Sequence, residues 1–149
     1  MKNLALVLVL GALGCSHDCT AIGCTTYVNF HLSEALREDG TYLIEVVADG
    51  ESMSCEVQVP QVPEIECDDK VGITREEVTS NEGGAQTGTA GDAIEAVGVI
   101  GIYEQVSIVI TRNTAVLADD EVEPDYDEED HGKGCGSCAV SEHELSVDP

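Results

Sequence analysis

The sequence contains no tryptophan and only one phenylalanine and four tyrosines among its 149 residues. Its core must therefore be mainly aliphatic, with Phe30 as the single phenylalanine. Basic residues are also scarce, because six Lys and Arg stand against 30 Asp and Glu, for a formal net charge of −24. This balance argues against binding to nucleic acid or to anionic lipid headgroups, which are recognised through Lys and Arg. It indicates solubility, attraction of cations, or a basic protein partner.

The N-terminus lacks an apolar run long enough to span a bilayer but has one of signal-peptide length. Lys2 supplies a positive charge, and the apolar run extends from Leu4 to Leu13. A run this short is typical of a secretory signal peptide and not of a transmembrane helix. The sequence therefore predicts an exported protein.

The run ends in the letters ALGC at residues 12–15. This ending resembles the signal of bacterial lipoproteins, in which the signal peptidase cuts before a cysteine that is then diacylated. The resemblance implies that Cys15 carries lipid and anchors the chain to a bilayer. Ser16 follows instead of Asp, which by the same resemblance favours the outer membrane. The family prefers Leu where this chain has Ala12, so an ordinary secretory peptide cut nearby is the alternative.

Cysteine parity agrees with an acylated Cys15. Once that cysteine is assigned to lipid, six of the seven cysteines remain, an even number that suits an oxidising compartment. These disulfide candidates are Cys19, Cys24, Cys55, Cys67, Cys135 and Cys138. Six cysteines allow fifteen pairings, so the sequence does not fix the connectivity. We expect Cys55 to pair with Cys67, and the two N-terminal cysteines to pair with the two C-terminal ones.

A β-hairpin from Thr41 to Val59 is the clearest structural signal. Asp49-Gly50 suits a two-residue type I′ turn, in which both central residues need positive φ. This turn sets the register and sorts the side chains onto two faces. The facing pairs on one side are Val46 with Met53, Ile44 with Cys55 and Tyr42 with Val57. The other side carries Leu43, Glu45, Val47, Ser52, Ser54 and Glu56.

Further strands follow from alternation and from turn residues. The predicted strands are Thr26 to Ser33, Val71 to Glu76, Ala93 to Tyr103, Gln105 to Thr111, Ala115 to Glu123 and Val140 to Val147. A helix is the alternative for Ala93 to Tyr103, but Gly98 and Gly101 favour a strand with a bulge or bend. Glu34 to Gly40 is expected to be a polar connection with room for one helical turn, and Ser80 to Asp92 a mobile glycine-rich loop. A bulge at Asp119-Asp120 would bring Val122 inside.

Seven or eight short strands without a long helix predict an antiparallel β-sandwich. An immunoglobulin-like arrangement is the first choice, although the Cys-Trp-Cys hallmark is absent. The expected organisation is a signal peptide at residues 1–14, a lipidated tether at 15–24 and one β-sandwich domain at 25–149. The letters CTAIGC at 19–24, a central strand cysteine and CGSC at 135–138 are similar to small uncharacterised secreted bacterial lipoproteins. That resemblance implies no activity.

The C-terminal cysteines and histidines are the candidate zinc ligands. His131, Cys135, Cys138 and His143 supply the thiolate and imidazole groups that tetrahedral zinc takes. Disulfides are the favoured alternative, because thiols tend to oxidise in an exported protein. The Cys-x-x-Cys spacing also occurs in redox enzymes, but there the first cysteine caps a helix within a βαβ unit, and none is predicted here. The zinc deaminase pattern is absent, because no His-x-Glu lies upstream.

The segment from Asp119 to Asp130 carries nine carboxylates in twelve residues, which raises calcium as a ligand. Neither possible start of a calcium loop completes the pattern. Counting from Asp125 places Asp130 where glycine is needed, and counting from Asp127 places Cys138 where the final Glu is needed. A solvated acidic edge that resists pairing with other sheets is the favoured interpretation.

These observations predict a lipid-anchored β-sandwich of the cell envelope, held in the outer membrane and facing the periplasm or the exterior. Its expected role is structural or that of a protein-interaction module, with no cofactor and no catalytic activity. An enzyme would need a convergent pocket of titratable groups, and the chain offers few Arg, Lys and His to build one. The alternative is an envelope metal-binding protein that uses the zinc candidates or the acidic segment.

Overall fold

The computed structural model describes residues 25–60, 66–80, 87–130 and 137–148. These residues form ten strands and no helix. The strands are β1 (Tyr27–Leu36), β2 (Gly40–Ala48), β3 (Glu51–Val59), β4 (Glu66–Cys67), β5 (Val71–Ser80), β6 (Thr87–Ile100), β7 (Val106–Arg112), β8 (Ala115–Val122), β9 (Asp127–Asp130) and β10 (Ser137–Leu145).

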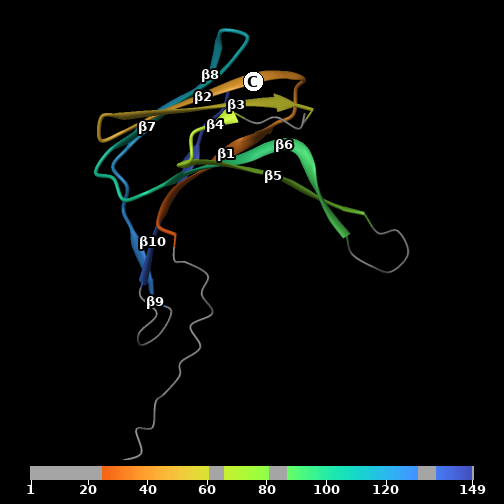
Figure 1. Ribbon diagram of the computed structural model, residues 1–149. Coiled ribbons are helices and arrows are strands. Elements are labelled where there is room, and N and C mark those ends of the chain that lie inside the picture. The colour runs from red at the N-terminus through yellow and green to blue at the C-terminus, as the bar shows by residue number, and fades with distance from the viewer. Residues whose placement is uncertain (1–24, 61–65, 81–86, 131–136, 149) are drawn as a thin grey trace, which may run out of the picture.

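The strands form two five-stranded sheets packed face to face (Figure 1). One sheet has the order β5-β6-β1-β10-β9 and is called the β1 sheet below. The other has the order β4-β3-β2-β7-β8 and is called the β2 sheet. The predicted all-β sandwich is therefore confirmed, with more strands than expected. One pair departs from the antiparallel prediction, because β1 and β10 run parallel.

The central hairpin has the register that its turn predicted. Tyr42 pairs with Val57 and Ile44 pairs with Cys55, and all four side chains are buried. The turn residue Asp49 has a φ of 49°, and the glycine after it also has a positive φ. The Asp49 carboxylate accepts hydrogen bonds of 2.9–3.1 Å from the next connection, at the backbone N–H groups of residues 104 and 105. These bonds fix the hairpin tip to the link between β6 and β7.

The core between the sheets is aliphatic, as the composition requires. Its largest fully buried side chains come from both sheets and include one aromatic ring from each, Phe30 in β1 and Tyr42 in β2. Phe30 is 0% exposed, and its ring lies 5.7 Å from that of His143 in the adjacent strand β10. Burial of these apolar surfaces is the main favourable term in holding the sheets together.

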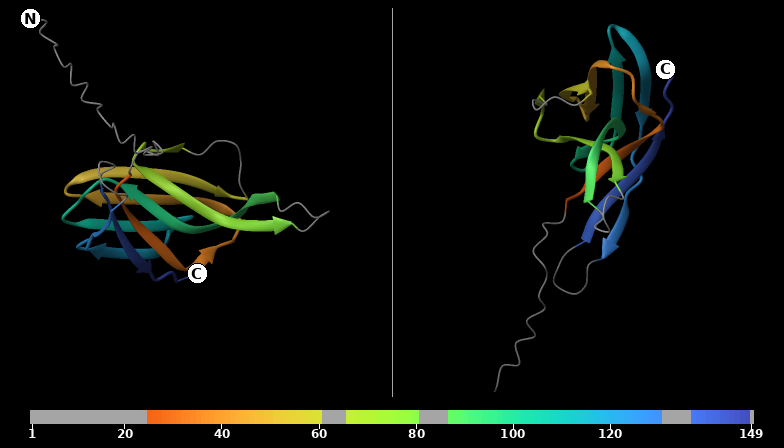
Figure 2. Two further views of the ribbon diagram at one scale, coloured as in Figure 1. Left: turned by 90° about the horizontal axis from the view of Figure 1, so that it is seen from below. Right: turned by 90° about the vertical axis from the view of Figure 1, so that its right-hand side faces the viewer.

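Two predicted connections are wrong, because strands continue through them. β1 runs to Leu36, which is buried, so the polar link expected at Glu34 to Gly40 shrinks to three residues. The glycine-rich stretch expected to be a mobile loop also pairs, because Thr87 lies opposite Ser80. Residues 81–86 lie outside the described residues. The pairing of β5 with β6 uses backbone hydrogen bonds, which do not depend on the side chains, so the glycine-rich sequence can still form it. The paired ends of β5 and β6 extend past the other strands (Figure 2).

The position of the bulge in β8 also differs from the prediction. Ile110 pairs with Ala118 and Thr111 with Val116, so Leu117 is the extra residue, and no shift occurs at Asp119-Asp120. A bulge here places Leu117 and Ala118 both in buried positions. Burial of two apolar neighbours explains why the irregularity falls there. Val122 packs against the core, as expected.

Three other details of the strands depart from the predictions. β6 passes Gly98 in register and stops at Ile100, before Gly101 with its φ of 139°. The acidic segment contributes a strand of its own, β9, which pairs with β10. The last strand, β10, begins at Ser137, because its first residues pair with β9, and it ends at Leu145. The prediction was Val140 to Val147.

Cys55 and Cys67 form a disulfide, as the sequence predicts, and it joins β3 to the short edge strand β4. The two cysteines are twelve residues apart in the sequence, so the bond closes a small loop. We expect the Cys55→Ala/Cys67→Ala variant to lose about 2–3 kcal/mol of unfolding free energy, because the unfolded chain regains that loop entropy. Urea denaturation of the parent and the double variant measures this loss. Identical midpoints for the two proteins would contradict it.

Candidate functional site

The residues expected to hold zinc do not form a cluster among the described residues. His131 and Cys135 lie outside them, as do Cys15, Cys19 and Cys24. Cys138 is buried and disulfide-bonded, whereas zinc needs a thiolate. His143 is half-buried. In the described part of the chain, no three His, Cys, Asp or Glu side chains converge on a metal position.

The calcium candidates are dispersed along an exposed edge. Asp125 precedes β9, and Asp127 begins it, opposite Val140 of β10. Both aspartates are exposed to solvent. A strand directs successive side chains to opposite faces, so this segment does not wrap its carboxylates around one point as a calcium loop does.

A serine and a histidine meet on the inner side of β10. Ser141 Oγ lies 2.9 Å from His143 Nε2, and the serine is only 2% exposed. A serine nucleophile must reach its substrate, and this hydroxyl is enclosed by the core. The pair satisfies a buried polar group next to Phe30, and it gives no evidence of hydrolysis.

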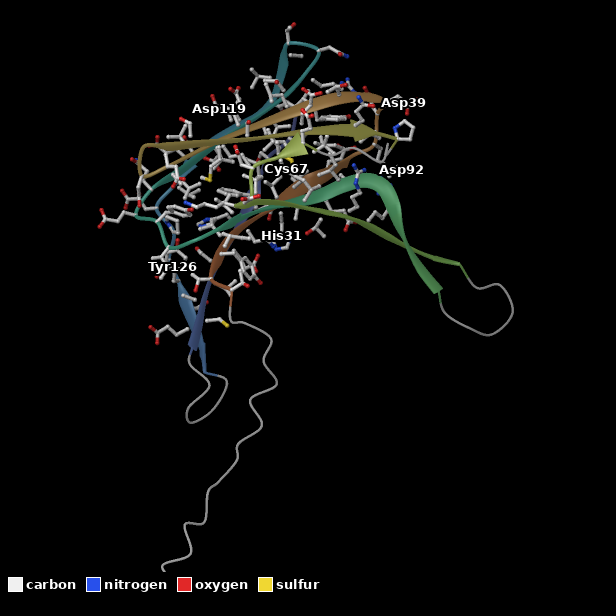
Figure 3. All side chains as sticks on the ribbon, in the orientation of Figure 1. His31, Asp39, Cys67, Asp92, Asp119 and Tyr126 are labelled. Atoms are coloured by element: carbon white, nitrogen blue, oxygen red, sulfur yellow. A yellow bond between two sulfur atoms is a disulfide. The ribbon has the colours of Figure 1, made fainter. Side chains whose placement is uncertain are left out.

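The outer face of the β1 sheet carries a hydrogen-bonded trio that sequence analysis did not find. Glu142 Oε2 lies 2.6 Å from His31 Nε2 and accepts a 3.0 Å hydrogen bond from Asn29 Nδ2. Asn29 Nδ2 also lies 3.1 Å from the histidine nitrogen. Asn29 and His31 alternate outward along β1 (His31 is labelled in Figure 3), and the parallel pairing with β10 places Glu142 opposite Asn29. That pairing joins residues more than one hundred positions apart, which no local pattern reveals.

A shallow hollow lies beside this trio. Asn29 pairs with Gly98 of β6, and Gly98 pairs with Gly72 of β5, so two neighbouring positions on the outer face have no side chain. The hollow measures about 280 Å³. Its lining residues are Tyr27, Asn29, Gly72, Ile73, Thr74, Gly98 and Ile100.

A pair of tyrosines closes the corner between β6 and β7. The Tyr103 hydroxyl donates a 2.8 Å hydrogen bond to the carbonyl of Ile100, and the backbone N–H of Tyr103 donates one of 2.8 Å to the Tyr126 hydroxyl (Tyr126 is labelled in Figure 3). Burial raises the pKa of Tyr103, so the phenol stays protonated and can donate. A Cβ atom at Gly101 would lie 2.6 Å from the Tyr103 ring. This cluster is structural.

The basic side chains of the described residues are already engaged with oxygen acceptors. Arg37 pairs with Glu76, Lys70 with Glu51 and Arg112 with Glu38, while Arg75 donates to the carbonyls of Gln58 and Asp92. The Arg37 guanidinium lowers the pKa of Glu76, chiefly through their hydrogen bond. Because only three of these four cations pair with a carboxylate, and each with a single one, most of the described carboxylates keep an uncompensated negative field.

The outer face of the β2 sheet combines exposed aliphatic side chains with carboxylates. Leu43, Val47 and Val116 are 37%, 41% and 58% exposed. Leu43 and Val116 flank Thr111 in one row across the sheet, and the row beside it carries Glu45, Val109 and Asp119. We call this surface the β2 face and define it as Leu43, Glu45, Val47, Val109, Thr111, Val116 and Asp119 (Asp119 is labelled in Figure 3).

None of the described segments is a helix with the length and hydropathy needed to cross a membrane.

Comparison with known proteins gives no relative. No protein-family model matches the chain, and no curated protein or solved structure shows significant similarity to it.

Proposed function

We propose that the chain is a lipid-anchored β-sandwich of the cell envelope that acts as a protein-interaction module without catalytic activity. The anchor is the acylated Cys15, in the outer membrane. The apolar run before that cysteine and the even number of remaining cysteines support this location.

We assign the sandwich to the immunoglobulin-like type in its general architecture. The support is a pair of tyrosine corners, in which a tyrosine hydroxyl bonds back to the backbone where the chain crosses between sheets. Tyr42 donates to the carbonyl of Glu38 at 2.8 Å between β1 and β2, and Tyr103 does the same to Ile100 between β6 and β7. The strand order differs from that of constant-type immunoglobulin domains, whose sheets are ABED and CFG.

The observation that carries the interaction role is the β2 face. Leu43 and Val47 of β2 and Val116 of β8 stay exposed on a regular sheet. The remaining large aliphatic side chains of β2, Ile44 and Val46, are buried in the core. Apolar groups ringed by carboxylates fit a partner that presents apolar side chains surrounded by Lys and Arg. The formal net charge of −24 would speed association with such a basic protein and repel acidic ones.

Site-specific photo-cross-linking in cells tests the interaction. A photoreactive residue at Val116 should capture a basic protein, whereas the same residue at Thr74, exposed on the outer face of the β1 sheet, should not. The cross-link should weaken as salt rises, because the charged rim is screened. With the photoreactive residue kept at Val116, a Leu43→Asp/Val47→Asp variant should lose the cross-link at an unchanged melting temperature. Equal capture from both positions, or capture of an acidic protein, would contradict the proposal.

Intact mass spectrometry of the membrane-purified protein tests the anchor. With thiol alkylation before reduction, we expect an acylated Cys15 and no alkylated cysteine. An unacylated N-terminus would contradict the anchor. Two or more alkylated thiols together with a bound metal would favour the metal-binding alternative, and His131, Cys135, Cys138 and His143 would then be the residues to mutate.

A further inference from the structure

Two glycines in strand interiors are not explained by the fold. Gly72 in β5 lies directly opposite Gly98 in β6. Glycine weakens a strand, and its usual reasons are a bulge, a positive φ or a lack of space. The register shifts of this strand pair lie further on, between Thr74 and Glu77. An added Cβ at either glycine would meet nothing nearer than 4.0 Å, and neither has a positive φ. The remaining reason is close approach by a ligand or by another chain.

The other three glycines whose side-chain space the structure describes differ clearly from this pair. Gly40, Gly50 and Gly101 have φ values of 148°, 83° and 139°, in the region that side chains disfavour. Each of the three stands outside a strand interior, in a turn or at a strand end. The fold itself therefore requires glycine at these three positions, and within this set of five the facing pair calls for another explanation. Gly88 and Gly91, which also lie in β6, are outside this set.

The side chains around the glycine pair form two walls. Outward-facing residues on neighbouring strands lie in rows, and the glycine row continues into Asn29 and Glu142. Tyr27 and Ile100 face each other in the row on one side of it, and Thr74, Ala96 and His31 occupy the row on the other. These flanking rows are four residues apart, which corresponds to about 13 Å along a strand. The hollow between them, about 280 Å³, has room for a sugar ring.

We propose that this hollow binds a neutral saccharide. The floor over Gly72 and Gly98 is strand backbone without side chains, which leaves a flat surface for the face of a pyranose ring. Tyr27 and Ile100 add apolar contact at one side of the ring. The Asn29 carbonyl oxygen can accept a hydrogen bond from a sugar hydroxyl, and the Thr74 hydroxyl at the other side can donate and accept. Apolar side chains combined with a few placed polar groups are common in small-ligand sites.

An extended peptide fits the same surface less well. Gly98 lies in a strand paired on both sides, so its backbone N–H and C=O bond within the sheet and not upward. A peptide laid over this floor would leave its own backbone groups without partners from the glycines. Peptides that bind sheets through their backbone add to an edge instead.

The electrostatics select an uncharged sugar. Glu142 borders the hollow, and the chain carries a net charge of −24, so an acidic sugar would be repelled. Glu142 and His31 hold the Asn29 amide at 3.0 and 3.1 Å. An amide held in place before the ligand arrives loses less side-chain entropy on binding.

Titration of the full chain followed by NMR tests the site. The probes are hexaoses of β-1,4-glucose, α-1,4-glucose and N-acetylglucosamine, with a hyaluronan hexasaccharide as the acidic comparison. We expect saturable shifts at Tyr27, Asn29, Gly72 and Gly98 with at least one neutral hexaose. Gly98→Val should fill the hollow and weaken binding by at least about tenfold, at an equal or higher melting temperature. Asn29→Ala should weaken it as well.

Ser52→Val is the matched control, because it adds the same side chain at an exposed strand position on the other sheet. It should leave the affinity within about twofold of the parent. Three results would overturn the proposal: no saturable shift with any neutral hexaose at about 10 mM, unchanged affinity in Gly98→Val, or binding of the hyaluronan probe alone. The site is independent of the β2 face, so loss of the Val116 cross-link would not affect this test.

Discussion

Phe30→Ala is expected to lower the free energy of unfolding by about 3–5 kcal/mol. Phe30 is the only phenylalanine and is fully buried between the sheets. Removing its ring loses the transfer free energy and leaves a cavity next to His143. The rigid pairing of β1 with both β6 and β10 limits how far the walls can collapse into that cavity. The loss corresponds to a fall in melting temperature of roughly 10–20 °C.

Urea denaturation and thermal melting of the purified chain measure this effect. Leu43→Ala is the control, because its side chain is 37% exposed on the β2 face, and its effect should stay within about 0.5 kcal/mol. A loss below about 1 kcal/mol for Phe30→Ala would show that Phe30 does not lie in a packed core. Similar losses for both variants would show that the two sheets do not bury the side chains described above.

Gly101→Val is expected to cost about 3–5 kcal/mol, because backbone strain and overpacking act together. The φ of 139° suits glycine, and a β-branched residue there is strongly disfavoured. Its Cβ would also lie 2.6 Å from the Tyr103 ring. Moving that ring would break the hydrogen bond from Tyr103 to Ile100 and disturb the one to Tyr126. The corner between the two sheets would therefore loosen.

Gly98→Val provides a matched comparison within the same strand region. It introduces the same side chain three residues earlier, where the added Cβ has space and the backbone is extended. Because valine favours strands and glycine does not, we expect Gly98→Val to be neutral or to stabilise by about 0.5–1 kcal/mol. Thermal melting of the two variants side by side measures the difference. A larger loss in Gly98→Val than in Gly101→Val would refute the assigned backbone geometry.

The features that the sequence predicted correctly depend on neighbours in the chain. Asp49-Gly50 dictates a tight turn, and that turn places Cys55 opposite Ile44 without information from elsewhere. The disulfide with Cys67 follows from the same short range. The bulge was misplaced because alternation tolerates an extra residue at several points of β8. Only the packing of the finished core selects Leu117.

The candidate saccharide site could not be predicted, because it depends on pairings between distant segments. Gly98 alone indicates a bend, and Gly72 alone indicates a weak strand. Their significance appears only when β5 and β6 place them opposite each other. Likewise, Asn29 and Glu142 meet only because β1 pairs with β10. The sequence indicates a solvated edge for the acidic segment, with calcium as the alternative, but that its residues Asp127–Asp130 form the edge strand β9 follows only from their pairing with the distant β10.

The parallel pairing of β1 with β10 governs when the chain can finish folding. β1 is the first of the described strands along the chain, and its partner on one side, β10, is the last of them. The β2 sheet can assemble from the middle of the chain, but the β1 sheet stays open along β1 until β10 arrives. Contacts of such long sequence separation make folding slow. While the chain folds, the open edge of β1 is therefore exposed to wrong pairing, and pairing with β10 removes that hazard.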